Sequence, residues 1–175
     1  MEISKNIEIE RRWLLSEARE DSYRVLEMLS NLLVDCKKSE IKQWYISLNP
    51  VLRLRSHDDS EFVLCVKTKG QHTGMGTPEK ESELSKEEFD NLMKFIKKNP
   101  VRKTRYYIPL ENGFTAELDV FYDFILGLII VEVEFPDEQS AISFIPPDWF
   151  GKNEITGKKA YSNAMFYSFM PDINK

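Results

Sequence analysis

Four pairs of acidic side chains recur along this chain, each with a single residue between its two carboxylates. The pairs are Glu8 with Glu10, Glu79 with Glu81, Glu117 with Asp119, and Glu132 with Glu134. In a β-strand, residues two apart point to the same face, so each pair would place two carboxylates side by side. Carboxylate oxygens are the ligands that Mg²⁺ prefers in proteins. The spacing therefore indicates a site for a divalent metal ion.

Basic side chains follow the same two-residue spacing in other segments. These pairs are Arg53 with Arg55, Lys67 with Lys69, and Lys103 with Arg105. Guanidinium groups can bind phosphate through two parallel hydrogen bonds, and ammonium groups bind it as point charges. A solvated face would normally mix the two signs, but here the signs tend to separate by segment. We infer an interior in which acids hold a metal ion and bases hold a small polyanion.

Apolar residues alternate with these charges, which is the period of a strand with one polar and one apolar face. We predict strands at 7–15, 39–48, 51–56, 62–69, 79–84, 101–110, 114–121 and 128–135. We predict helices at 17–34, 85–98, 137–144 and about 160–170. Ser85 and Glu88 have the spacing of a capping box, which marks the start of the second helix. The Gly-rich segment 70–78 is a predicted loop.

Eight strands with short connections favour an α+β fold built on an antiparallel sheet. Closing that sheet into a barrel would remove its exposed edges. We predict an eight-stranded closed tunnel with the charged face inside and the four helices packed on the apolar outside. At 175 residues the chain is expected to form a single domain, 1–175.

Composition narrows the possible partners. The net charge of −5 argues against a broad nucleic-acid surface, so the clustered bases point to a small anion instead. No window approaches about 18 consecutive apolar residues, and the first residues lack the pattern of a secretory signal, so we expect a cytoplasmic protein without a membrane segment. Cys36 and Cys65 lack metal-site spacing, and neither is expected to form a disulfide in that compartment.

Ordered motifs along nearly the whole chain, from Glu8 to Asn163, resemble the CYTH superfamily, also called triphosphate tunnel metalloenzymes. The similarity is greatest to short bacterial members that hydrolyse inorganic tripolyphosphate. The motifs are Glu8-x-Glu10, Gln43-Trp-Tyr45-Ile46, Arg53-x-Arg55, Lys67, Lys103-Thr-Arg105-Tyr106, Glu117-x-Asp119, Glu132-x-Glu134, the segment Phe144 to Gly151, and Glu154-Ile-Thr156.

This resemblance implies hydrolysis of tripolyphosphate to diphosphate and phosphate with Mg²⁺ or Mn²⁺, in a protein that is often a homodimer. It implies phosphate contacts from Arg53, Arg55, Lys67, Lys69, Lys103 and Arg105. It implies that metal ligands and their supporting groups come from Glu8, Glu10, Glu79, Glu81, Glu117, Asp119, Glu132 and Glu134. Glu134 would also activate the attacking water.

Two positions depart from the family pattern. Arg12 stands where the family usually has a Lys, which is thought to pair with a Tyr, here Tyr45, in activating water. Arginine stays protonated and cannot act as a base, so Arg12 could position phosphate but could not relay a proton. Thr77 stands where related sequences often have an Arg, which removes one phosphate contact.

Three kinds of function remain open at this point. The first is a metal-dependent tripolyphosphatase. The second is another enzyme on the same scaffold, either a class IV-type adenylate cyclase or a hydrolase of thiamine or nucleoside triphosphates. The third is a binding module for polyphosphate that has lost turnover, which the presence of Arg12 keeps open.

Overall fold

The computed structural model describes residues 6–67 and 76–173, within which lie eight strands and four α-helices. The α+β class and the antiparallel pairing predicted from the sequence are confirmed. The chain divides into two compact units, each with four strands of a curled antiparallel sheet. The first unit comprises residues 1–8, 41–101 and 159–175, and the second comprises residues 9–40 and 102–158.

The sheet of the first unit has the strand order β5-β4-β3-β2. The strands are β2 (Lys37–Leu48), of which residues 41–48 belong here, β3 (Val51–His57), β4 (Glu61–Lys67) and β5 (Gly76–Leu84). Their bounds confirm the predicted strands except that β5 begins three residues early. The predicted loop at 70–78 therefore falls partly in β5 and otherwise outside the described residues, as does the predicted end of β4 at residues 68–69.

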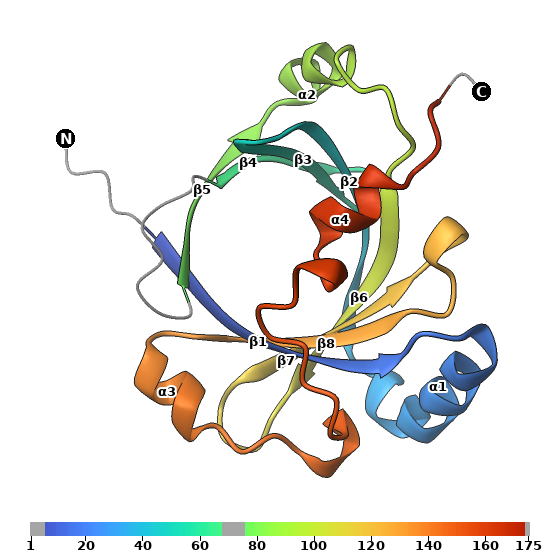
Figure 1. Ribbon diagram of the computed structural model, residues 1–175, viewed down its shortest axis with the longest axis vertical. Coiled ribbons are helices and arrows are strands. Elements are labelled where there is room, and N and C mark those ends of the chain that lie inside the picture. The colour runs from blue at the N-terminus through green and yellow to red at the C-terminus, as the bar shows by residue number, and fades with distance from the viewer. Residues whose placement is uncertain (1–5, 68–75, 174–175) are drawn as a thin grey trace. The chain divides into compact units, whose positions relative to one another are not determined.

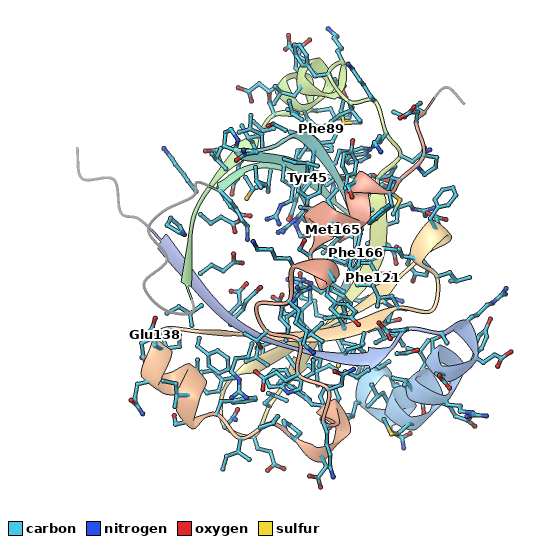
Figure 2. The ribbon with its side chains drawn as sticks, in the orientation of Figure 1. Tyr45, Phe89, Phe121, Glu138, Met165 and Phe166 are labelled. Carbon is cyan, nitrogen blue, oxygen red and sulfur yellow. The ribbon has the colours of Figure 1, made fainter. Side chains whose placement is uncertain are left out.

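Trp44 and Tyr45 show how the two faces of this sheet differ. Trp44 packs edge-on against Phe89, with 5.8 Å between ring centroids, and Phe89 belongs to α2 (Lys86–Met93). Tyr45 points to the other face and contacts Tyr167, with centroids 5.1 Å apart. Tyr167 lies in α4 (Asn163–Ser168), so α2 and α4 cover opposite faces of the sheet (Figure 1). Figure 2 shows the same arrangement, with Phe89 toward α2 and Tyr45 toward α4.

The position of α4 corrects one expectation. We predicted that all four helices would pack on the apolar face, but α4 lies on the face that carries Tyr45. Residues two apart on β2 and their cross-strand partners share this face, and they include the charged side chains of β3. The helix thus brings its own aromatic surface, centred on Tyr167, to the polar side of the sheet.

Helix α2 begins as predicted but ends early. Its capping box is complete, because the Ser85 side chain accepts from the Glu88 backbone N–H while the Glu88 carboxylate accepts from the Ser85 backbone N–H. The predicted end at residue 98 is wrong. The helix ends at Met93, and two tight turns follow, in which the N–H groups of Phe95 and Ile96 donate to the carbonyls of Leu92 and Met93. The turn buries Ile96 and leaves Phe95 exposed.

The sheet of the second unit has the strand order β6-β7-β8-β1. The strands are β6 (Val101–Pro109), β7 (Thr115–Phe121), β8 (Ile129–Phe135) and β1 (Asn6–Ser16), with β6 and β1 each beginning in the other unit. Helices α1 (Arg19–Leu33) and α3 (Glu138–Ser143) cover one face. Short 3-10 helices lie at Asp123–Ile125 and Asp148–Phe150, and a third, Lys159–Tyr161, belongs to the first unit.

The apolar core of the second unit lies on that helix-covered face. Trp13 of β1 is nearly fully buried and packs edge-on against Phe150, with 4.8 Å between ring centroids. Leu29 of α1 and Ala141 of α3 belong to the same cluster. Because successive strand residues alternate faces, packing Trp13 here turns Arg12 to the opposite face. No helix within the described residues is long and apolar enough to cross a membrane.

Arg11 fastens the segment after β8 to this apolar face. Its guanidinium forms two hydrogen bonds to the Glu154 carboxylate, at 2.9 and 2.8 Å. It also donates to the carbonyls of Ala141 and Phe144, and it lies 4.9 Å from the centre of the Trp13 ring. One side chain therefore holds α3 and the chain at residue 154 against strand β1.

Candidate functional site

The charged face of the first unit is set by strand register. Tyr45 pairs with Arg53, Arg53 with Cys65, and Cys65 with Glu81, so these four side chains form a row across the four strands. A parallel row contains Lys67, which pairs with Glu79. Since each strand alternates its faces, the Trp44 side of the sheet stays apolar.

Within this face, cations and carboxylates already pair with one another. Arg53 Nη2 lies 2.9 Å from Glu79 Oε1. Lys67 Nζ lies 2.7 Å from Glu8 Oε2 and 2.5 Å from Glu79 Oε2. Arg53 and Glu79 are buried, with 6% and 8% of their side chains exposed. A buried carboxylate with two cationic neighbours is held in the ionised form.

The two carboxylates on Lys67 are not equivalent. Burial and a hydrogen bond with Glu79 raise the pKa of Glu8 above its ordinary value. Burial alone would also raise the pKa of Glu79, but its hydrogen bond with Glu8 and the charges of Arg53 and Lys67 lower the pKa of Glu79 to about 2. Of these two carboxylates, Glu8 is therefore the one that takes up a proton first as the pH falls.

Cys65 belongs to this face, which we did not predict. Its Sγ donates to Glu79 Oε1 at 2.6 Å, and burial raises the pKa of the thiol to about 12. One ligand atom each from Cys65, Glu79 and Glu81 lies within 4.8 Å of the others. The signal was present in the sequence, because Cys65 precedes Lys67 by two residues and must share its face.

Tyr45 is buried beside the cations. Burial raises the pKa of its hydroxyl above the ordinary value, although the charges of Arg53, Arg55 and Lys67 act in the opposite direction. A raised pKa keeps the phenol protonated at neutral pH, so Tyr45 can donate a hydrogen bond but is a poor base.

The charged face of the second unit is organised around Arg105. Its Nε and Nη2 atoms each lie 2.7 Å from a different oxygen of Asp119, which is completely buried. The same guanidinium contacts Glu117 and reaches Glu132 Oε2 at 2.9 Å. Lys103, with 1% of its side chain exposed, also binds Asp119.

Arg12 completes this network from strand β1. It pairs with Glu132 across the strands, and its Nη2 lies 2.7 Å from Glu132 Oε1. Glu10 lies farther from Arg12, with 3.9 Å between Nε and Oε1. Burial alone would raise the pKa of Glu132, but the charges of Arg12 and Arg105 lower it far below the ordinary value. Glu132 is therefore ionised across the physiological range.

The structure places the predicted site residues in two groups. The first unit brings together Glu8, Tyr45, Arg53, Arg55, Lys67, Glu79 and Glu81. The second brings together Glu10, Arg12, Lys103, Arg105, Glu117, Asp119 and Glu132. Glu134 faces the same way as Glu132 but is exposed, and it pairs with Glu10 across the strands. Lys69 and the side chain of Thr77 lie outside the described residues.

Comparison with known proteins adds independent information. A scan against models of protein families finds no match. The chain is 39% identical over 120 residues to an inorganic triphosphatase of Nitrosomonas europaea, covering 69% of this chain and 76% of that protein. It is 32% identical over 160 residues to an inorganic triphosphatase of Acetivibrio thermocellus, covering 90% of both. The chain belongs to the CYTH family of triphosphate tunnel enzymes.

Solved CYTH structures share the fold. A crystal structure of an inorganic triphosphatase has a TM-score of 0.61 and 30% identity, covering 94% of this chain and 96% of that one. A structure described as an adenylate cyclase candidate from Bacillus halodurans has a TM-score of 0.54 at 20% identity, covering 87% of this chain and 97% of that one. At that identity the second likeness concerns the fold alone. Membership of the CYTH family implies use of a divalent metal ion, and the carboxylates described above are suitable ligands.

Proposed function

We propose that this protein hydrolyses inorganic tripolyphosphate to diphosphate and phosphate. The observation that carries the proposal is the 32% identity to an inorganic triphosphatase over 90% of both chains. The charged faces support it, because phosphoryl transfer depends mainly on positioning and charge neutralisation. Both faces supply guanidinium groups for phosphate oxygens and carboxylates for cations.

The phosphate contacts are assigned to Arg53, Arg55 and Lys67 in the first unit and to Lys103 and Arg105 in the second, with Lys69 as a further candidate. Each described cation now binds carboxylates of its own unit. Incoming phosphate oxygens would take over part of these contacts. Arg105 is the most firmly held of these cations, because its guanidinium donates four hydrogen bonds to three carboxylates.

The metal ligands are assigned to Glu8, Glu10, Glu79, Glu81, Glu117, Asp119, Glu132 and Glu134, as direct ligands or as their supports. Mg²⁺ or Mn²⁺ is the proposed ion because the donor set is dominated by carboxylate oxygens. When bound, such an ion neutralises phosphate charge and orients the phosphate oxygens.

Glu134 is assigned as the general base that accepts a proton from the attacking water. The water oxygen forms a bond to the terminal phosphorus, the bridging P–O bond breaks, and diphosphate leaves with that bonding pair. Glu134 is the accessible carboxylate of β8, whereas Glu132 is bound to two guanidinium groups. Arg12 and Tyr45 stay protonated and act by holding oxygens in place.

The remaining expectations stay proposals. The eight strands are proposed to close into one tunnel within a single domain, 1–175. A homodimer and a cytoplasmic location are proposed by analogy with the family and from the sequence.

One other function has a specific observation in its favour. Arg12 replaces the usual Lys and is bound to Glu132, so a receptor that holds tripolyphosphate without turnover would keep all the ion pairs described. Metal-dependent binding of tripolyphosphate without release of phosphate, together with release by Arg12→Lys, would favour this receptor.

The test is phosphate release from tripolyphosphate, ATP and thiamine triphosphate with Mg²⁺ or Mn²⁺, and with a chelator. We expect tripolyphosphate to be the preferred substrate, Glu10→Gln to lose most activity, and Arg55→Ala to raise KM. Arg102→Ala serves as the matched control, since Arg102 forms an exposed ion pair with Asp123. Equal activity in all three variants would refute the site assignment, and cyclic AMP from ATP would favour a cyclase.

A further inference from the structure

Gln43 is completely buried in β2, yet its side chain makes no hydrogen bond to any residue that the structure describes. Its exposed fraction is 0%, and neither Oε1 nor Nε2 has a hydrogen-bond partner within the described chain. A carboxamide has two donors and an acceptor with two lone pairs. Leaving such a group buried without partners costs about 1–3 kcal/mol. An apolar side chain of the same length would fill this space without that cost.

The side chain lies on the charged face of the first unit. Gln43 precedes Tyr45 by two residues, so both point to the same side of β2. Its partner across the strands is Arg55, and the next pair along is Tyr45 with Arg53. Gln43 is therefore a neutral polar side chain next to Arg55, with Arg53 in the following pair on the same face.

A second orphaned atom lies on the helix that covers this face. Asn163 Oδ1 is buried without a hydrogen-bond partner among the described atoms. Asn163 and Tyr167 are four residues apart in α4, so they share one side of the helix. Tyr167 contacts Tyr45, which places the Asn163 side of α4 toward β2. A buried amide oxygen thus lies on the side of α4 that contacts Tyr45.

We propose that Gln43 is a substrate-binding residue whose Nε2 donates to a non-bridging phosphate oxygen of tripolyphosphate, while its Oε1 accepts from a water molecule. The inference rests on the proposed function and adds a residue to it. A carboxamide suits this place because it binds an oxyanion without adding another positive charge. Its carbonyl oxygen can accept a hydrogen bond from water, whereas guanidinium and ammonium groups have no acceptor.

The test uses Gln43→Met, which keeps the length of the side chain and removes its hydrogen bonds. Without substrate, the melting temperature should equal or exceed that of the wild type, because no hydrogen bond is lost on substitution. With tripolyphosphate and Mg²⁺, KM should rise about tenfold or more, since a hydrogen bond to a charged group is lost. The stabilisation of the folded protein by added tripolyphosphate should shrink in parallel, while kcat changes less than KM.

Gln139→Met is the matched control, since Gln139 lies exposed on α3, and it should leave KM unchanged. A lower melting temperature, or a failure to fold, in Gln43→Met would overturn the inference, because either would show that Gln43 supports the substrate-free fold. An unchanged KM would overturn it as well, while leaving the triphosphatase assignment intact. If the wild type neither binds nor hydrolyses tripolyphosphate, the proposed function fails and the inference fails with it.

Discussion

Arg12 and Glu132 form a buried ion pair in which Arg12 Nε and Nη2 both contact one carboxylate oxygen, at 2.8 and 2.7 Å. The other oxygen of Glu132 is held by Arg105 at 2.9 Å. The two arginines therefore divide one carboxylate between them. The family's usual Lys could make only a single-point contact at the Arg12 position.

Arg12→Met should destabilise the protein by about 3 kcal/mol, because it removes one partner of a buried ion pair. Arg12→Lys should cost about half as much, since one contact to Glu132 can be kept. Urea unfolding at neutral pH measures both effects. Arg102→Met removes an exposed pair with Asp123 and should cost at most about 1 kcal/mol. A cost for Arg12→Met no larger than this control would contradict the prediction.

Glu154→Gln should reduce the loss in the free energy of unfolding that accompanies acidification. The hydrogen bonds from Arg11 lower the pKa of Glu154 below its ordinary value of 4.5, although partial burial acts in the opposite direction. The contribution of ionised Glu154 to the stability of the fold is therefore fully present above pH 4.5. It is lost as the pH falls through the pKa of Glu154 in the folded protein, which lies below 4.5. The effect should be modest, because 37% of the Glu154 side chain is exposed to solvent.

Urea unfolding between pH 7 and pH 3 measures this slope. Glu138→Gln, on the exposed side of α3, is the control for loss of a surface carboxylate. The interpretation of the Arg11 contact is wrong if Glu154→Gln and wild type lose stability in parallel on acidification.

Tyr167→Ala should destabilise the first unit by about 3 kcal/mol. The side chain is 4% exposed, and its removal would leave a cavity against Tyr45. Phe169→Ala is the matched control, since Phe169 directly follows the same helix and is 78% exposed. Thermal unfolding of both variants measures the difference. Equal losses would show that α4 is not anchored through Tyr167.

Gly127→Ala should be far more damaging than Gly113→Ala. Both glycines have positive φ angles, +100° and +84°. A Cβ at Gly127 would lie 2.5 Å from the backbone nitrogen of Arg19, where α1 begins, whereas a Cβ at Gly113 meets nothing within 4 Å. We expect about 1 kcal/mol for Gly113→Ala and several times that for Gly127→Ala. Similar melting temperatures would show that the β7–β8 connection can move away from α1.

Much of this arrangement could be predicted because the period of a strand is strict. Once Trp13 is placed in the core, Arg12 must face the other way, and the same logic aligns Glu132 with it. The charged pairs on β3, β6, β7 and β8 follow the same rule. Their shared face could be predicted because burial of one face determines the other, while their roles in the site stay a prediction.

Other features depend on tertiary packing that a single sequence does not display. Helix α4 has only six residues, and its apolar side chains lie on several sides of the helix. Their pattern therefore does not indicate which face of a sheet the helix covers. The early end of α2 has the same origin, since the chain turns after Met93 to bury Ile96. The contact of Cys65 with Glu79 became visible only with the register, because a thiol between Leu64 and Val66 gives no sign of a polar neighbour in the sequence.

The charges of both faces are compensated at hydrogen-bond distance, as in Lys67 with Glu8 and Arg105 with Asp119. A few ångströms away, the opposite fields largely cancel, well within the screening length of about 8 Å at physiological salt. Such a surface therefore exerts little long-range electrostatic attraction on polyelectrolytes in solution. Only a compact anion can bind well, because its oxygens can replace the carboxylates in these ion pairs one at a time. Selectivity between anions therefore arises from direct contacts and not from long-range attraction.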